Sequence, residues 1–359
     1  MAWKQIDNPL VSVIIPTYNR KTLVLEAVES VLQGTFQDFE LIVVDDGSSD
    51  GTVEVLVHRG FTVRGSVDLS SIRTTAALPS DMFSPSTPHK DGLAPPLDHG
   101  SVSSSGSAAY RDSPDPFYAE PAPSVDSSFP APPLILLSLT HTGFPGLVRN
   151  RGARIARGTY LAFLDSDDLW LPQKLELQLK AHREAITRGQ RYRISHTREL
   201  WDRKGKIVSQ RKQKHRREGD VFQDALKKCI LGPSTVMMEK SLFLEAGGFR
   251  EDIQIAEDYE LWVRITSFEP VLYLEEPLTI KRGGFPDQLS QTHPFIEPFR
   301  LKALKDLVDQ GFFLHRADRQ KEATEELVRK CQIHAEGCRK RGKLEEAAYW
   351  EAQAEQYRT

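Results

Sequence analysis

The sequence has few cysteines and no hydrophobic run of membrane-spanning length. Its three cysteines, Cys229, Cys331 and Cys338, are too few and too unevenly spaced for a disulfide framework or a zinc site, which indicates a reducing cytoplasm. No stretch reaches the roughly 18 uninterrupted apolar residues of a membrane span, and the N-terminus has no signal-peptide pattern. We therefore expect a cytoplasmic protein whose only possible membrane contact is peripheral, at the inner face.

The sequence also has no strong excess of charge of one sign. Its 47 basic and 50 acidic side chains give a formal net charge of -3, which argues against a nucleic-acid partner. One basic run, residues 203–217, is either a solvated surface or a contact for an anionic membrane or an acidic acceptor. With 359 residues, the chain is long enough for one large α/β domain with accessory segments.

Short apolar runs predict a βαβ unit at the start of the chain. Residues 11–16 and 39–44 are rich in β-branched side chains, as buried parallel strands are, and apolar residues recur at helical spacing over 24–32 between them. The turn after the first strand, residues 16–21, has no Gly-x-Gly-x-x-Gly, so a dinucleotide site is a poor interpretation.

Acidic clusters follow two predicted strands. Asp45 and Asp46 end the second strand, and residues 165–168, Asp-Ser-Asp-Asp, follow an apolar run at 160–164. Because parallel strands collect their ligands at their carboxyl ends, both clusters should face one crevice. The Asp-x-Asp spacing gives two hard oxygen ligands that can share a divalent cation, which in turn can neutralise a diphosphate.

A Ser/Pro-rich segment separates the two clusters. We expect residues 58–144 to form a disordered insert, because this composition cannot bury enough apolar surface to fold alone. Residues 134–137, Leu-Ile-Leu-Leu, could supply the strand that is otherwise missing beside the second one. Without that strand the crevice would lose a wall, and the protein would be an inactive relic. Residues 297–359 predict two or three helices outside the core, which could bind a protein partner.

Five motifs occur in an order that resembles the family 2 glycosyltransferases of the GT-A fold. They are residues 13–19 (Val-Ile-Ile-Pro-Thr-Tyr-Asn), 43–52, 149–152 (Arg-Asn-Arg-Gly), 163–168 and the pair Glu257-Asp258. The resemblance covers roughly residues 9–57 and 146–290. It implies an α/β fold with a central, mostly parallel sheet flanked by helices, followed by the C-terminal helical extension.

The resemblance also implies domain boundaries and a reaction. A glycosyltransferase domain would comprise residues 1–57 and 145–296, with a nucleotide-binding half (9–57 and 145–170) and an acceptor half (171–296). The enzyme would invert the anomeric centre as it moves a sugar from a nucleotide-diphosphate donor, a UDP-sugar, to a glycan or lipid-linked acceptor. It would use Mn²⁺ or Mg²⁺ and would act in cell-envelope or exopolysaccharide synthesis.

The resemblance assigns the residues of the donor site. Pro16, Thr17 and Tyr18 would line the base and ribose pocket. Asp46, with Asp45 beside it, would accept a hydrogen bond from the base, although Asp-Asp-Gly-Ser could also be only a turn. Arg149 would reach the nucleotide or, alternatively, be a surface charge at a helix start.

The resemblance likewise assigns the metal and the base. Asp167 would be the principal metal ligand, Asp165 a ribose or metal contact, and Asp168 a neighbour that orients the loop. Asp258 would be the general base with Glu257 beside it, and like-charge repulsion within the pair would raise the proton affinity of one of the two carboxylates. The same pair could instead only cap a helix.

Other assignments are less specific. Lys281 and Arg282 resemble the late basic segment that approaches the diphosphate, although the histidine commonly found there is missing. His196, Trp201 and Trp262 could stack on a sugar or pack in the core. Two hypotheses follow: a metal-dependent glycosyltransferase, and a non-catalytic protein that binds sugar nucleotides or acts as a scaffold.

Overall fold

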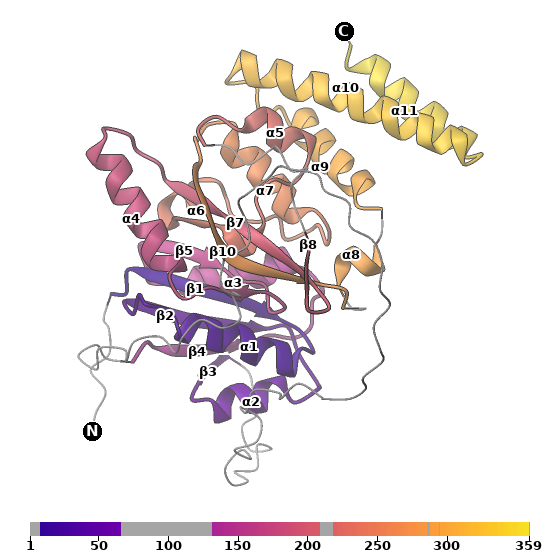
Figure 1. The fold of residues 1–359 in the computed structure, drawn as a ribbon. Helices are drawn as coiled ribbons and strands as arrows, with labels where there is room; N and C mark the ends of the chain where they lie inside the picture. Colours follow the sequence, from indigo (N-terminus) through magenta and orange to yellow (C-terminus); the bar gives the residue numbers. More distant parts are fainter. Residues whose placement is uncertain (1–7, 66–130, 209–217, 286–287, 294, 359) are drawn as a thin grey trace, which may run out of the picture. The chain divides into compact units, whose positions relative to one another are not determined.

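A mixed β-sheet runs through the part of the chain that the computed structural model describes, residues 8–65, 131–208, 218–285, 288–293 and 295–358 (Figure 1). The strand order is β3-β4-β2-β1-β5-β9-β7-β10-β6, with β8 paired to β7, and five of the nine strand pairings are parallel. The strands are β1 Val11–Thr17, β2 Phe39–Asp45, β3 Thr62–Gly65, β4 Leu134–Ser138, β5 Tyr160–Phe163, β6 Leu169–Trp170, β7 Ile194–Arg203, β8 Lys206–Val208, β9 Met237–Glu239 and β10 Leu272–Gly283.

The predicted βαβ unit is present at the start of the chain. β1 pairs in parallel with β2 on one side and with β5 on the other, and Thr17 lies opposite Asp45 at the carboxyl end. Nearly every residue of β1 and β2 is buried, as expected for strands covered on both faces. The helices of this half are α1 Lys21–Leu32, α2 Thr52–His58 and α3 Pro145–Ile155.

Residues 134–138 supply the strand that the sequence left uncertain. β4 pairs in parallel with β2, with Leu41 opposite Leu134, and β3 extends the sheet beyond it. The expected insert boundaries of 58 and 144 are therefore too wide. β3 and β4 belong to the sheet, and the loop after β4 is hydrogen-bonded to Asp46 at the end of β2. Residues 66–130 lie outside the described residues, so disorder there stays a prediction. Residues 209–217 of the basic run also lie outside them, so the role of that run stays open.

The second half of the sheet carries the remaining helices. β9 runs antiparallel to both β5 and β7, whereas β10 is parallel to β7 and antiparallel to β6. Because β10 pairs with β6, which follows the second acidic cluster in the chain, the end of β10 lies close to that cluster. The remaining α-helices are α4 Lys174–Thr187, α5 Phe222–Lys227, α6 Lys240–Glu245, α7 Glu257–Thr266, α8 Leu289–Thr292, α9 Glu297–Asp309, α10 Ala317–Lys340 and α11 Leu344–Gln356.

The C-terminal helices are not all outside the core. Leu304 of α9, Leu327 of α10 and Phe313 between these helices belong to the same buried cluster as Trp262. The rings of Phe222 and Phe313 lie 5.6 Å apart. Figure 1 shows α10 and α11 as a helix pair, with α10 crossing above α5 and α9. The expectation of a wholly separate extension is therefore wrong for α9 and the first half of α10. None of the helices placed by the structure is long and apolar enough to cross a membrane.

Candidate functional site

The carboxyl ends of β1 and β2 form the first part of the site. Thr17 and Asp45 are buried, and neither Thr17 Oγ1 nor Asp45 Oδ1 has a hydrogen-bond partner among the described residues. The other oxygen of Asp45 accepts a hydrogen bond from the backbone N–H of Ser48 (3.1 Å). Burial raises the pKa of Asp45 despite this bond. Two buried oxygens without partners among the described residues, with Pro16 half-buried beside them, leave hydrogen-bonding capacity that a polar ligand could satisfy.

Asp46 holds the loop that follows β4. Its Oδ1 accepts hydrogen bonds from the N–H and the hydroxyl of Thr142, and its Oδ2 accepts one from the N–H of Gly143, all at 2.9 Å. Nδ1 of His141 lies 3.1 Å from Oδ2. These four contacts fill the acceptor positions of a carboxylate. In this conformation Asp46 orders the loop, and its contact with a base stays a prediction.

The same loop places an aromatic ring on Tyr18. The rings of Tyr18 and His141 stack with centroids 4.0 Å apart and an angle of 19° between their planes. Tyr18 remains 41% exposed, as a residue that lines an open pocket should be. His141 could not be predicted from the sequence, because its only signal is a short polar stretch between a strand and a helix.

The second acidic cluster follows β5, as predicted. Asp168 is buried, accepts hydrogen bonds from the Ser234 hydroxyl (2.6 Å) and the Arg282 N–H (3.0 Å), and has a pKa raised well above its usual range by burial and then by Asp167. These bonds attach the loop to neighbouring segments, which agrees with the orienting role expected for Asp168.

Asp165 and Asp167 are the residues that could hold a cation. Asp165 Oδ1 accepts a hydrogen bond from Arg149, and Asp167 Oδ2 accepts hydrogen bonds from Arg20 and Gln288, both at 2.7 Å. Each carboxylate keeps its other oxygen clear of these partners. Mn²⁺ or Mg²⁺ in such a site needs only one or two carboxylates, with the remaining positions filled by phosphate and water oxygens. The donor set therefore fits a hard divalent ion.

Arg149 joins this cluster to the start of α7. Its Nη2 donates to Asp165 (2.6 Å) and its Nη1 donates to Glu257 (2.8 Å). The arginine is only 6% exposed, so the alternative interpretation as a surface charge is wrong. Burial opposes the charge, but Asp165 and Glu257 outweigh it and raise the pKa of the guanidinium.

The two acidic residues at the start of α7 lie in different environments. Glu257 is buried against Arg149, and burial, followed by the charge of Asp258, raises its pKa to about 7. Asp258 faces a cavity of about 490 Å³, and its Oδ2 accepts a hydrogen bond from the Cys229 thiol (3.3 Å). A partly exposed carboxylate beside a buried one is a suitable arrangement for a base that must meet a substrate hydroxyl.

Several segments from the second half of the chain line the cavity beside Asp258. β7, β10, the 228–235 segment and α9 all contribute, so α9 belongs to the site although the sequence placed it outside the domain. Trp262, in contrast, is fully buried, which is the packing role. The polar and aromatic side chains that line the cavity include His196, Glu199, Trp201, Cys229, Asp258, Lys281, Arg282, Gln288 and Arg300.

Lys281 and Arg282 bring positive charge to the acidic cluster. Burial opposes the charge of Lys281, but Glu199, Asp168 and Asp165 outweigh it and raise its pKa. Arg282 donates through Nε to the carbonyl oxygen of Asp167 (2.6 Å), and its buried Nη2 has no partner in the part of the chain that is placed. A buried N–H without a partner beside the cation site fits an anionic oxygen.

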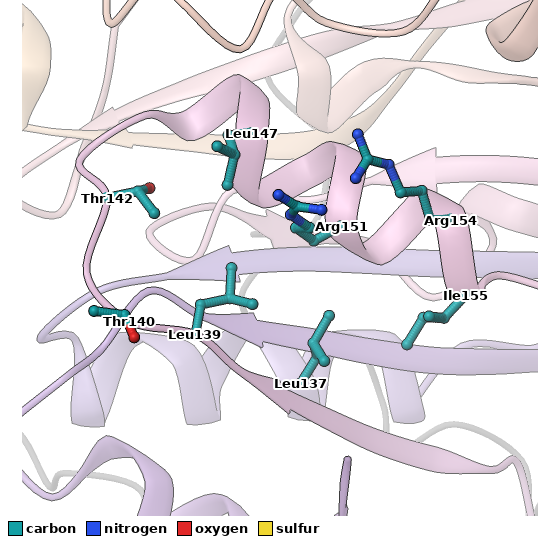
Figure 2. A pocket seen from close by; sticks show the side chains of 8 residues that line it. All are labelled: Leu137, Leu139, Thr140, Thr142, Leu147, Arg151, Arg154 and Ile155. Carbon is teal, nitrogen blue, oxygen red and sulfur yellow. The ribbon is translucent and has the colours of Figure 1, made fainter. Parts of the chain in front are cut away.

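A second cavity lies on the outer side of the sheet, beside α3. Its volume is about 510 Å³, and Figure 2 shows Leu137 and Leu139 of β4 and the following loop below Leu147 and Arg151 of α3. Thr142, which binds Asp46, lies at its edge. None of the predicted site residues lines this cavity, so it is separate from the site described above.

Comparisons with known proteins agree with this geometry. Residues 12–60 match the model of "Glycosyl transferase family 2", and residues 137–281 match that of "Glycosyltransferase like family 2". An uncharacterised glycosyltransferase of Rickettsia felis is 28% identical over 301 residues, 83% of this chain. The chain spans only 36% of that relative's length.

Two further proteins are similar over most of their length. The UDP-Glc:α-D-GlcNAc-diphosphoundecaprenol β-1,3-glucosyltransferase WfgD of Escherichia coli is 24% identical over 72% of this chain and 71% of its own. The structure of S. aureus TarS 1–349 with UDP-GlcNAc superimposes with a TM-score of 0.58 at 16% identity, covering 96% of this chain and 79% of that one. These matches support a family 2 glycosyltransferase and confirm the predicted GT-A fold.

Proposed function

We propose that the chain is a metal-dependent, inverting hexosyltransferase that moves a sugar from a UDP-sugar to a glycan or lipid-linked acceptor. One observation carries the proposal. Arg149 bonds Asp165 through one nitrogen and Glu257 through the other, so the end of the site that would hold a diphosphate adjoins the general base Asp258. Donor and acceptor can then meet at the mouth of a single cavity.

The first two strands would bind the nucleoside. The partnerless oxygens of Thr17 and Asp45 would accept hydrogen bonds from the base and ribose, and Pro16 and Tyr18 would line the pocket. Asp46 would fix the loop that brings His141 to Tyr18, and it could bind the base itself only if one of its loop contacts opened.

Positive charge would hold the diphosphate. Lys281 and the unpaired Nη2 of Arg282 would donate to its oxygens. Asp165 and Asp167 would hold Mn²⁺ or Mg²⁺, which when bound stabilises the negative charge of the departing nucleoside diphosphate.

Asp258 would take the proton from the acceptor hydroxyl. As that oxygen forms its bond to the anomeric carbon, the bond from this carbon to the diphosphate oxygen breaks on the opposite face, and the configuration inverts. Glu257, when ionised above pH about 7, would place a like charge next to Asp258 and so favour its protonated product. His196 and Trp201 line the cavity at the acceptor side and would contact a sugar ring.

The similarity to WfgD supports the donor and acceptor classes. That protein's name states a UDP-sugar donor and a lipid diphosphate acceptor, and both would suit a cavity that carries Lys281, Arg282 and Arg300. A role in cell-envelope or exopolysaccharide synthesis, with peripheral contact at the inner face of the membrane, follows from the same acceptor class.

Donor binding is the first test. UDP titrated calorimetrically into the full chain with Mn²⁺ should bind, and EDTA or Asp167→Ala should abolish binding. The exposed residue Asp318, replaced as Asp318→Ala, is the matched control and should behave as the wild type. Absence of UDP binding would redirect the test to GDP and dTDP, and failure of all three would contradict the proposal.

Turnover is the second test. Asp258→Asn should keep donor binding and lose UDP-sugar hydrolysis and transfer. Donor binding without turnover with any acceptor would instead support the alternative of a non-catalytic protein that binds sugar nucleotides. The paired strands β2 and β4 give the pocket the wall that the relic hypothesis assumed to be missing, which favours the enzyme.

A further inference from the structure

Three metal-ligating side chains meet between the last two helices, far along the chain from the acidic clusters. His334 and Cys338 lie four residues apart on α10, and Glu346 lies in the first turn of α11. One nitrogen, sulfur or oxygen ligand atom from each lies within 4.8 Å of those of the other two. His334 Nε2 is 3.2 Å from Glu346 Oε1.

The geometry points to a zinc site made of one histidine, one thiolate and one carboxylate. Zn²⁺ takes these three ligand types in a tetrahedral set and accepts water in the fourth position. A thiolate selects zinc over the hard cations Mg²⁺ and Mn²⁺, so this site would differ in chemistry from Asp165 and Asp167. The i, i+4 spacing of His334 and Cys338 puts both on one face of α10.

Neighbouring residues hold the three proposed ligands in place. Cys338 is fully buried, and His334 is held by an edge-to-face contact with Trp350 (5.4 Å between centroids). Nη2 of Arg341 donates to the Cys338 sulfur at 3.6 Å, which fixes the direction of this side chain. Lys343 bonds Glu346 Oε2 at 3.0 Å, which leaves Oε1 on the side of His334.

A metal bridge would stabilise the packing of α11 against α10. Only Ala347 and Ala354 are buried among its residues, and Trp350 packs against the core while only partly buried, so α11 docks through a narrow apolar face. A metal that bridges two helices adds its binding energy to their docking, because the opened pair does not hold the ligands together. In its absence, the His334–Glu346 ion pair is partly exposed and worth little.

Cobalt absorbance tests the site directly. The full chain, stripped with EDTA and dialysed, is titrated with Co²⁺ while the near-ultraviolet thiolate-to-cobalt charge-transfer band is followed. We expect the band to saturate at one ion per chain and to disappear on addition of Zn²⁺. The carboxylate site cannot produce this band, so Asp167→Ala should leave it unchanged.

Variants separate the ligands from their neighbours. Cys338→Ser should abolish the band, and Cys331→Ser, which removes a buried thiol from the same helix outside the cluster, should retain it. His334→Gln, at a partly exposed side chain, should weaken metal affinity at least about tenfold without unfolding the helix. A missing band in the wild type, or a band that persists in Cys338→Ser, would overturn the proposal.

Hydrogen exchange tests the role in docking. Zn²⁺ at 100 times its dissociation constant should slow amide exchange in α11 by up to about 100-fold in the wild type and not in Cys338→Ser. Equal exchange with and without Zn²⁺ in a protein that binds the metal would overturn the docking role.

Discussion

The thiol of Cys229 lies 3.3 Å from Oδ2 of Asp258 and 3.2 Å from the carbonyl oxygen of Leu231, so its one hydrogen is shared between these two acceptors. Burial, followed by the charge of Asp258, raises the pKa of this thiol well above its usual range, so the thiol stays protonated and keeps its role as a donor at neutral pH. If Asp258 is the base that we propose, Cys229 would act through it as a positioning residue, a relationship that no motif in the sequence indicates.

Removing this thiol should slow turnover without weakening donor binding. A hydrogen bond that holds the Asp258 carboxylate in place contributes about 1 kcal/mol, which corresponds to about a fivefold change in rate. We expect kcat to fall by about this factor in Cys229→Ala, with the KM for the donor unchanged. Cys229→Ser, which keeps a donor, should stay close to the wild type. An unchanged kcat in Cys229→Ala would contradict the positioning role.

Replacing Arg149 should strongly destabilise the fold. Arg149→Met leaves Glu257 buried and Asp165 partly buried without their cation, which costs about 3 to 5 kcal/mol in the free energy of unfolding. Denaturant unfolding above pH about 7, where Glu257 is ionised, measures the loss. The double variant Arg149→Met/Glu257→Gln should recover part of it, because it removes one unpaired charge, and strictly additive losses would contradict the coupling.

The raised pKa of Glu257 predicts that the free energy of unfolding falls as pH rises. The folded protein keeps the Glu257 proton up to pH about 7, whereas the unfolded chain releases it near its ordinary value of 4.5. The stability that the proton provides is complete below pH 4.5 and is lost as pH rises to about 7.

Glu257→Gln should remove this cost. Relative to the wild type, the variant should gain on the order of 1 to 3 kcal/mol of unfolding free energy between pH 4.5 and 7.5. Glu355→Gln, at an exposed position in α11, is the control and should show no such gain. A gain that shrinks as pH rises would show that Arg149 keeps Glu257 ionised.

Two helical glycines should respond in opposite directions to alanine. A Cβ on Gly152 of α3 would lie 2.7 Å from a methyl of Ile14 and 3.0 Å from one of Val44, both in the core. Gly152→Ala should therefore cost about 1 to 3 kcal/mol through overpacking. On α10, the nearest atom to a Cβ on Gly337 belongs to the flexible Arg341 side chain (3.2 Å), so Gly337→Ala should stabilise by about 0.5 to 1 kcal/mol. Thermal unfolding of both variants gives the comparison.

Much of the half of the sheet built on β1, β2 and β5 could be predicted from the sequence. Buried parallel strands are local apolar runs, so β1, β2 and β5 and the acidic residues after them are visible without any tertiary contact. The burial of Arg149 could not be predicted, because it depends on Asp165 and on Glu257, which is 108 residues further along the chain.

The sequence by itself determined where the carboxylates stand relative to the strand ends, since period and composition are local properties. Only the tertiary structure decided which groups meet these carboxylates. Asp46 with His141, Asp258 with Cys229, and His334 with Glu346 are pairs from separate segments. Their partners are chosen by how strands and helices pack, and a hydrogen bond or metal ligand set needs positions that a single segment does not fix.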